Sequence, residues 1–429
     1  MPEVRSTTLA ETRFEETLPS GLHVVVLPRP GYAKTFGMFT TRYGSIDHHF
    51  RPLGGQEIRV TDGIAHFLEH KLFEEPDGDA FTRFGRKGAS ANAFTGHTQT
   101  SYLFTATDHV IENLHTLLDF VQAPYLTDAN VAKEKGIIEQ EIRMYDDHAT
   151  WRGYRAMLEN LYHVHPVRID IAGTVESISQ IDVESLLTCY RTFYHPANMV
   201  LVVCGDVDPD VVFREVRANQ ARKSFEPWPG VERLQDPEPD TVHAASTTLH
   251  LSVARPILRL GFKDRAPGID GEALQFHHLV AGIALELTLG KASDLYNRLD
   301  ESGLIDATFS YDHEAEPGYA YTMLGGETDD PEGLAIALVE GFQQIRTHGF
   351  EAEAFERVRR KRLGEFLRVF NSPESLTHEF TTSYLAGVDL YVIPALLDRV
   401  TLEHVTERAR ALFDPERMSK VVIMPTQES

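Results

Sequence analysis

One short segment carries the residue types of a metal-dependent hydrolase. Within residues 61–73, His66 and His70 stand four positions apart, and Glu69 lies between them. On a helix, residues four apart project from one face, one turn apart, which suits two imidazole ligands of a tetrahedral zinc ion. Glu69 reaches the same face, where a carboxylate can accept a proton from a water that the cation has acidified. The spacing therefore predicts a zinc site that carries out hydrolysis.

The segment 61–73 is itself predicted as a helix. Asp62 is the expected N-cap, and the apolar face consists of Ile64, Phe67, Leu68 and Leu72. The motif is short, so the alternative interpretation is a surface helix with two solvated histidines. A third ligand elsewhere in the chain would favour the metal site.

The helix expected over residues 130–145 offers such a ligand. At about 100° per residue, Glu134 and Glu141 project in nearly the same direction, beside an apolar stripe. Glu139 falls on the opposite flank, where a solvated ion pair is expected. Geometry therefore favours Glu141 or Glu134 as the third ligand and does not choose between them.

The chain is predicted to contain two similar domains. Its 429 residues exceed what one hydrophobic core usually holds. Residues 226–245 are rich in proline and acidic residues, which predicts an extended linker that packs poorly. We expect a zinc-bearing domain over 1–225, this linker, and a homologous domain without a metal site over 246–429.

An internal repeat supports this division. Residues 181–199 and 400–418 align without a gap, and the matched pairs are Glu184 with Glu403, Tyr194 with Phe413, Pro196 with Pro415, and Met199 with Met418. Each segment predicts a capped helix, beginning after Asp182 or Thr401, a proline turn and a strand. The halves also begin alike, with strands at 22–27 and 35–43 and at 246–253 and 257–262. The expected fold is α+β, in which each half is a sandwich of a mixed or antiparallel sheet and helices.

Composition narrows the class of protein. The formal charge is −23, from 41 basic and 64 acidic residues, which argues against a nucleic-acid partner. No apolar run is long enough to span a bilayer, and the N-terminus lacks the apolar region of a signal peptide. Cys189 and Cys204 are too few for a disulfide framework. A cytoplasmic protein without a membrane partner is expected.

These motifs resemble the inverted-zincin peptidases of the pitrilysin and insulinase family, in its processing-peptidase-like branch. The pattern is His66-x-x-Glu69-His70 followed by Glu134-x6-Glu141, and the likeness extends to residues 88–95, 165–178 and 193–198. The resemblance implies that Glu141 is the third zinc ligand, that Glu134 supports the site, and that each chain holds one zinc ion. It also implies that two double-domain chains enclose a chamber in which peptides are cut.

Residues 90–104 are predicted as a strand near the metal. In the family this strand lies at a sheet edge and pairs with the substrate, whose backbone hydrogen bonds require little of its sequence. Asn92 and Ala93 are the candidates for this contact. An ordinary inner strand is the alternative.

One family feature is missing from the second half. Relatives carry an Arg-x6-Tyr pair that stabilises the oxyanion, and the matching positions here are Leu299 and Asp306. Arg298 is one residue away, which rotates it by about 100° around a helix. We therefore expect a homologous partner subunit to supply the pair, most simply in a heterodimer, with a homodimer as the other arrangement.

The same residues allow other interpretations. The alternative function is a non-catalytic scaffold subunit of such a heterodimer, against which the intact histidine and glutamate set argues. A different zinc hydrolase on the same motif is a third possibility. The pair His277-His278 lies among apolar residues and is interpreted as part of a packed helix.

Overall fold

The computed structural model describes residues 3–6, 9–76, 78–265 and 268–426. Contacts divide the chain into two compact units. Unit 1 comprises Met1–Ile142, Asp170–Gln235 and Arg368–Leu385, and unit 2 comprises Arg143–Ile169, Asp236–Leu367 and Ala386–Ser429. The change at Gln235 falls inside the segment 226–245 predicted as a linker. Each unit also includes a segment from the other half of the sequence. Cutting the chain at one point therefore does not separate the two units.

Unit 1 is built on a sheet of strand order β1-β2-β3-β11-β4-β10-β9. In this order the strands are Glu3–Ser6, Glu11–Thr17, His23–Pro28, Met199–Gly205, Thr35–Thr41, Thr100–Ala106 and Ser90–Thr95. The central strands β11 and β4 are buried along their whole length, as expected for apolar strands covered on both faces. Shorter strands form β12-β5-β6 (Val231–Arg233, His49–Pro52, Ile58–Arg59) and β7-β8 (Glu74–Glu75, Gly78–Asp79).

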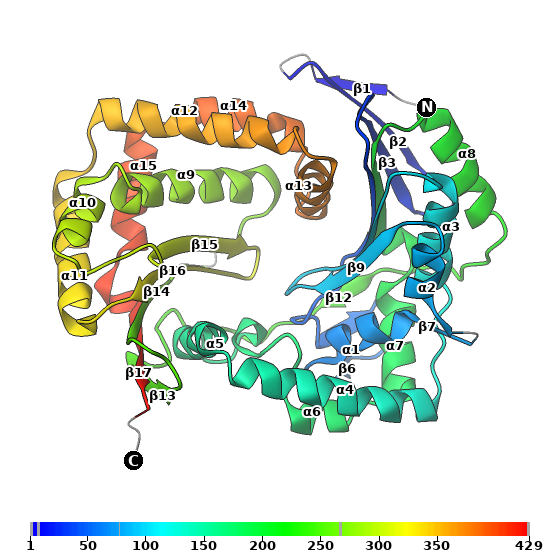
Figure 1. Cartoon of the computed structure of the whole chain (residues 1–429), viewed down its shortest axis with the longest axis horizontal. Coiled ribbons are helices and arrows are strands. Elements are labelled where there is room, and N and C mark those ends of the chain that lie inside the picture. Colours follow the sequence, from blue (N-terminus) through cyan, green and yellow to red (C-terminus); the bar gives the residue numbers. More distant parts are fainter. Residues whose placement is uncertain (1–2, 7–8, 77, 266–267, 427–429) are drawn as a thin grey trace. The chain divides into compact units, whose positions relative to one another are not determined.

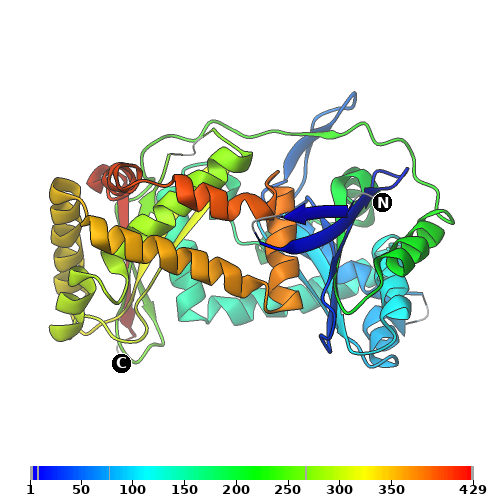
Figure 2. The same ribbon diagram turned by 90° about the horizontal axis from the view of Figure 1, so that it is seen from above.

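The helices of unit 1 are α1 (Ile64–Leu72), α2 (Ala80–Gly85), α3 (Val110–Val121), α4 (Asp128–Asp146, whose last turn belongs to unit 2), α6 (Val175–Ser179), α7 (Val183–Phe193), α8 (Pro209–Gln220) and α13 (Pro373–Leu385), with a 3-10 turn at Pro196–Asn198. Among these helices, α1, α2, α3, α8 and α13 contact this sheet. Helices α3 and α8 lie side by side (Figures 1 and 2).

Unit 2 repeats the central part of this plan. Its sheet has the order β13-β17-β14-β16-β15, with strands Ser246–Leu251, Met418–Pro425, Ile257–Lys263, Tyr319–Glu327 and Ser310–Glu316. Its helices are α5 (Ala149–Leu161), α9 (Gly271–Leu289), α10 (Asp294–Glu301), α11 (Pro331–His348), α12 (Ala352–Val369, whose end belongs to unit 1), α14 (Ile393–Arg399) and α15 (Leu402–Leu412), with 3-10 turns at Pro166–Arg168, Leu390–Val392 and Pro415–Arg417.

The two sheets are homologous strand by strand. The strands β3-β11-β4-β10-β9 correspond to β13-β17-β14-β16-β15, and every pairing has the same direction, parallel for the first pair and antiparallel for the others. Asp182 and Thr401 both cap their helices through complete capping boxes, as predicted. The predicted α+β fold with two homologous halves is confirmed.

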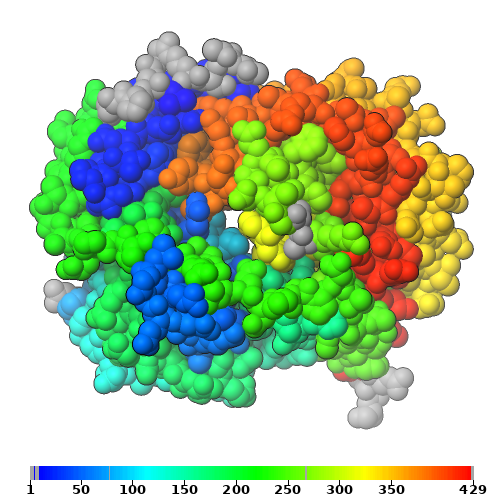
Figure 3. Space-filling model, turned by 180° about the vertical axis from the view of Figure 1, so that it is seen from behind, coloured from blue at the N-terminus to red at the C-terminus, as the bar shows by residue number. Residues whose placement is uncertain are grey.

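The exchanged segments place one helix from each half on the other sheet. Helix α5 packs on β13, β14 and β17, and α13 packs on β4 and β11 (Figure 1). The approach of α5 is close, because a Cβ at Gly261 on β14 would lie 2.3 Å from Met157 Sδ. In the space-filling view α13 (orange) lies against the N-terminal strands (blue), where Tyr384 stacks on His23 (Figure 3).

The predicted linker is extended and none of its residues is buried, but it is anchored at two places. Val231–Arg233 pairs with β5, and Glu238 accepts hydrogen bonds from three consecutive backbone N–H groups, those of residues 163–165, at 2.7–2.9 Å. Lys263 Nζ donates to the same carboxylate at 2.5 Å. The charge that made the segment look solvated therefore binds it to unit 2.

No single helix among the described residues is long and apolar enough to cross a membrane; one bent pair, Pro373–Leu385 with Leu390–Arg399, passes only when both helices are counted together.

Candidate metal centre

Helix α1 presents the two histidines, as the spacing predicts. Its apolar side chains Ile64, Phe67, Leu68 and Leu72 are buried, so the face with His66 and His70 is fixed by the core. The two imidazole rings lie 4.5 Å apart between centroids.

The predicted N-cap is wrong. The helix begins after Gly63, whose φ of 87° is left-handed and whose Cβ, if present, would lie 2.4 Å from the Ala172 carbonyl oxygen. The Asp62 carboxylate instead accepts a hydrogen bond from His48 Nδ1 at 2.9 Å.

Helix α4 brings Glu141 to the histidines. Glu141 Oε1 lies 3.7 Å from His66 Nε2, and Oε2 lies 3.5 Å from His70 Nε2. Two ligands about 2.0–2.1 Å from a tetrahedral zinc are separated by about 3.3 Å, so these three side chains fit the ion with small adjustments. Glu139 does not belong to this group of donor atoms. Of the two carboxylates that helix geometry left open, Glu141 is therefore the one that faces both Nε2 atoms.

Glu134 has a different place beside the same histidine. Its Oε1 lies 3.1 Å from His70 Nδ1, on the ring edge opposite Nε2. A carboxylate on Nδ1 holds the proton there and leaves the Nε2 lone pair free for a cation. Burial would raise the pKa of Glu134, but hydrogen bonds from His70 and the neighbouring Lys71 lower it, which keeps the carboxylate charged.

Lys71 is a functional neighbour that the sequence analysis did not identify. The side chain is fully buried and ion-paired with Glu74, and its Nζ lies 3.6 Å from Glu134 Oε2. A buried ammonium without a partner would be costly, so Lys71 requires the carboxylates of Glu74 and Glu134. A lysine in the otherwise apolar segment after His70 was the signal that could have found it.

Glu69 lies on the same helix face as the histidines and is nearly buried. Thr95 on β9 donates from Oγ1 to Glu69 Oε2 at 2.7 Å, a contact that sequence analysis also missed. Burial raises the pKa of Glu69, while the Thr95 hydrogen bond opposes this shift. One carboxylate oxygen is thereby oriented, and the pKa moves toward the range useful for proton transfer near neutral pH.

The two histidines differ in their protonation. Burial lowers the pKa of His66 to about 3, so its imidazole is neutral, the form that binds a cation. Burial would also lower the pKa of His70, but the Glu134 hydrogen bond and the carboxylates of Glu69 and Glu141 raise it.

Residues 90–104 form a hairpin rather than the single strand that was predicted. Among the strands that the structure describes, β9 pairs only with β10 and lies at the edge of the sheet. Asn92 and Ala93 are both on β9, and the Ala93 N–H donates to the Asn92 side-chain oxygen at 2.9 Å. The turn at 96–99 divides the segment, because Gly96 and Gln99 close it through a backbone hydrogen bond.

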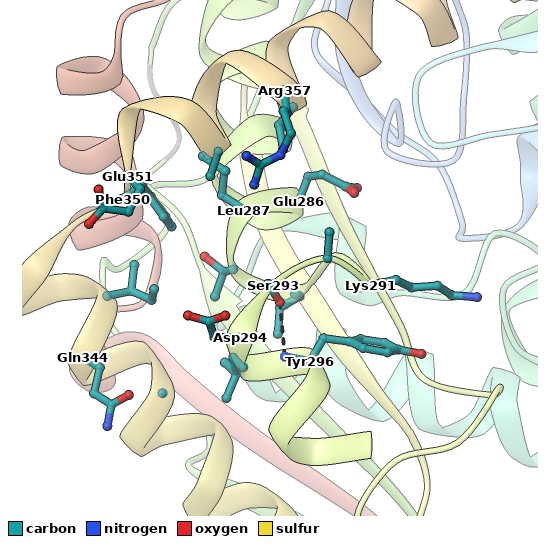
Figure 4. A pocket seen from close by; sticks show the side chains of 18 of the residues that line it. Glu286, Leu287, Lys291, Ser293, Asp294, Tyr296, Gln344, Phe350, Glu351 and Arg357 are labelled. Carbon is teal, nitrogen blue, oxygen red and sulfur yellow. Dashed lines mark hydrogen bonds between the residues drawn. The ribbon is translucent and has the colours of Figure 1, made fainter. Parts of the chain in front are cut away.

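The positions expected for an oxyanion-stabilising pair serve packing and an ion pair in unit 2. Leu299 is buried, and Asp306 Oδ2 accepts from Arg255 at 2.7 Å. Arg298 lines a cavity of about 960 Å³ between α9, α10, α11 and α12, where it donates to Gln344. Figure 4 shows this cavity, with Ser293 capping α10 through the N–H of Tyr296.

Family models and known relatives agree with these features. Residues 56–175 match the model described as insulinase (peptidase family M16), and residues 180–362 match the M16 inactive domain. A Bacillus subtilis protein described as an uncharacterized zinc protease, YmfH, is 45% identical over 421 residues, or 97% of each chain. The chain belongs to peptidase family M16. A second B. subtilis M16 relative, the uncharacterized zinc protease YmxG, is 25% identical over 83% of this chain and 87% of its own.

Solved structures extend the comparison. A crystal structure of an M16-like peptidase from Alicyclobacillus acidocaldarius has 40% identity and a TM-score of 0.94, covering 99% of both chains. Pitrilysin, at 16% identity and a TM-score of 0.75, shares the fold over 98% of this chain and 46% of its own. The predicted family is confirmed, and the relatives described as zinc proteases support a zinc metallopeptidase.

Proposed function

We propose that this M16 protein is a zinc-dependent endopeptidase that cleaves unstructured peptides, with His66, His70 and Glu141 as the metal ligands. The observation that carries the proposal is the convergence of these three side chains beside Glu69 on the same face of α1. The fit of two imidazoles and one carboxylate to zinc supports one ion at this site in each chain.

Zinc in this site would acidify a bound water and polarise the scissile carbonyl. Glu69 is placed to accept the proton of the attacking water and to pass it to the leaving amine. Thr95 holds Glu69 Oε2, so Oε1 is the oxygen available for this transfer. Glu134 acts as a positioning residue, because it orients His70 through Nδ1.

The exposed edge of β9 is the proposed binding place for the substrate backbone. A peptide can add to this edge as a further strand, which requires hydrogen-bonding groups and little side-chain selectivity. The Ala93 N–H is engaged by Asn92, so a substrate that binds there displaces the Asn92 side chain or uses its amide. Both predicted contact residues therefore belong to one hydrogen-bonding unit.

A homologous partner subunit would complete the active site. Unit 2 of this chain has Leu299 and Asp306 where an arginine and a tyrosine are needed, and Asp306 is held by Arg255. We propose a heterodimer whose partner supplies that pair and encloses the peptide in a chamber. We also propose that this complex acts in the cytoplasm. A non-catalytic scaffold subunit would not need the hydrogen bonds that hold the carboxylates of Glu69 and Glu134 in place.

The decisive experiment uses Glu69→Gln. This change removes the proton acceptor while leaving the metal ligands, so zinc content should be unchanged and hydrolysis of a fluorogenic peptide should fall about 10²–10⁴-fold. The matched control is Glu139→Gln, a carboxylate outside the donor group. Undiminished hydrolysis in Glu69→Gln would favour the scaffold interpretation, with the activity coming from another protein.

A further inference from the structure

A second cluster of metal-ligating side chains lies within unit 2. Asp264, His277 and His313 present donor atoms that all lie within 4.8 Å of one another. Asp264 directly follows β14, His277 is on α9, and His313 is on β15. Three separate elements thus converge on one point, and the backbone N–H of Asp264 is fixed by the Ala320 carbonyl at 2.9 Å.

His313 has a buried donor atom without a protein partner. Its Nδ1 lies 3.0 Å from the Thr322 hydroxyl, and among the described residues its buried Nε2 has no hydrogen-bond partner. The residue is 3% exposed, and Thr322 beneath it is fully buried. A buried polar atom without a partner is costly, and an imidazole held through one nitrogen is the usual arrangement of a metal ligand.

We propose that Asp264, His277 and His313 form a second divalent-cation site, which takes zinc through two imidazoles and one carboxylate. His277 Nε2 and Asp264 Oδ2 are 3.2 Å apart. This separation matches the distance of about 3.3 Å between two ligands of a tetrahedral zinc ion. Binding would supply the partner that His313 Nε2 lacks. In this role His277 is a ligand, rather than only the packed helix residue that sequence analysis described.

Arg408 determines how strongly this site binds. From α15, its guanidinium contacts both oxygens of Asp264, so the only carboxylate of the cluster is already neutralised. At the α1 site, by contrast, the carboxylates of Glu69, Glu134 and Glu141 all act on His70, and Lys71 lies beside Glu134. The second site should therefore be weaker and should fill only when zinc exceeds the amount that the first site takes.

The test uses the full chain with His66→Ala and His70→Ala, which removes the proposed catalytic site. Zinc titration followed by calorimetry should still show one ion bound per chain, and cobalt should give the visible absorption of a tetrahedral site. Adding His277→Ala should abolish both signals, whereas His250→Ala, an exposed histidine of the same unit, should leave them unchanged. Arg408→Met should tighten binding, because it removes the competing cation.

Two results would overturn the proposal. One is that the double variant binds neither zinc nor cobalt, which would make the cluster an Asp264–Arg408–His277 ion-pair network only. The other is binding that survives His277→Ala. Because His277 is partly exposed, this variant should fold, and circular dichroism verifies that it does. Anomalous scattering from zinc-soaked crystals of the unaltered chain gives an independent answer, since a peak among the three side chains is required. Failure here would leave the α1 site unaffected.

Discussion

The α1 region of unit 1 and the α9 region of unit 2 have the same framework and opposite chemistry. In unit 1, α4 directs Glu134 and Glu141 toward the histidines of α1. Its counterpart in chain order, α12, directs Lys361 and Arg362 toward α9, where they meet Glu286 and the Gly282 carbonyl. A helix that supplies carboxylates can complete a cation site, whereas one that supplies cations excludes a cation there.

The duplicated fold places helices at equivalent positions in the two units, and a few charged side chains determine the chemistry at each position. The proposed second site follows the same rule. It lies where α9 contacts β15 and α15, and Arg408 of α15 limits it by pairing with Asp264.

The largest effect should come from adding a partner. If unit 2 lacks the oxyanion-stabilising pair, this chain alone should cleave peptides about 10²–10³-fold more slowly than a mixture with a homologous chain that carries Arg and Tyr. Steady-state cleavage of an unstructured fluorogenic peptide measures the difference, and Arg→Ala in the partner should remove the gain. Equal rates for this chain alone and for the mixture would require Arg298 or another local residue to act instead.

Loss of Glu141 should remove the feature that most distinguishes the two units. In Glu141→Gln the carboxylate ligand becomes a poor neutral donor, so zinc retained after dialysis should fall from about one ion per chain to a small fraction. Metal analysis by mass spectrometry measures this content. Glu139→Gln changes a carboxylate on the opposite flank of the same helix and should retain zinc. Equal retention in both variants would remove Glu141 from the ligand set.

Glu134 should have a smaller effect because it acts through His70. Glu134→Gln keeps a polar group near Nδ1 but removes the charge, and we expect zinc affinity to fall about 10–100-fold. A competition titration with a chelator measures the affinity. Glu134→Asp should restore part of it if the carboxylate can still reach Nδ1, whereas a purely packing role would predict no such rescue.

The smallest effect concerns unit 2 and should not involve the metal. Four donors lower the pKa of Glu238 to about 2 against the opposing effect of burial. Its charge therefore stabilises the fold above pH 4.5, the value expected in the unfolded chain, and this contribution is lost as pH falls toward 2. Glu238→Gln should lower the free energy of unfolding at pH 7 by about 1–3 kcal/mol.

Thermal unfolding followed at several pH values measures this difference, which should shrink between pH 4.5 and pH 2. Glu232→Gln is the control, because Glu232 forms an exposed ion pair with Arg51 that is worth about 0–1 kcal/mol. Loss of zinc in Glu238→Gln would contradict the independence of the two regions.

Local periodicity was enough to predict the helix that carries His66 and His70, the internal repeat and the α+β class. His66 and His70 lie on one face of the helix 64–72 because the opposite face of the same helix is apolar. The capping boxes at Asp182 and Thr401 are likewise complete within four residues. Helix periodicity also reduced the third ligand to Glu134 or Glu141.

Only the tertiary structure decided what depends on approach between distant segments. Glu134 and Glu141 share one direction on α4, and their roles separate only because α1 lies opposite, with Nδ1 of His70 near one and Nε2 near the other. Thr95, the exchanged helices α5 and α13, and the meeting of His277 with His313 have the same origin. Spacing along a chain fixes direction within one element, whereas the distance between elements is set by the core that they bury together.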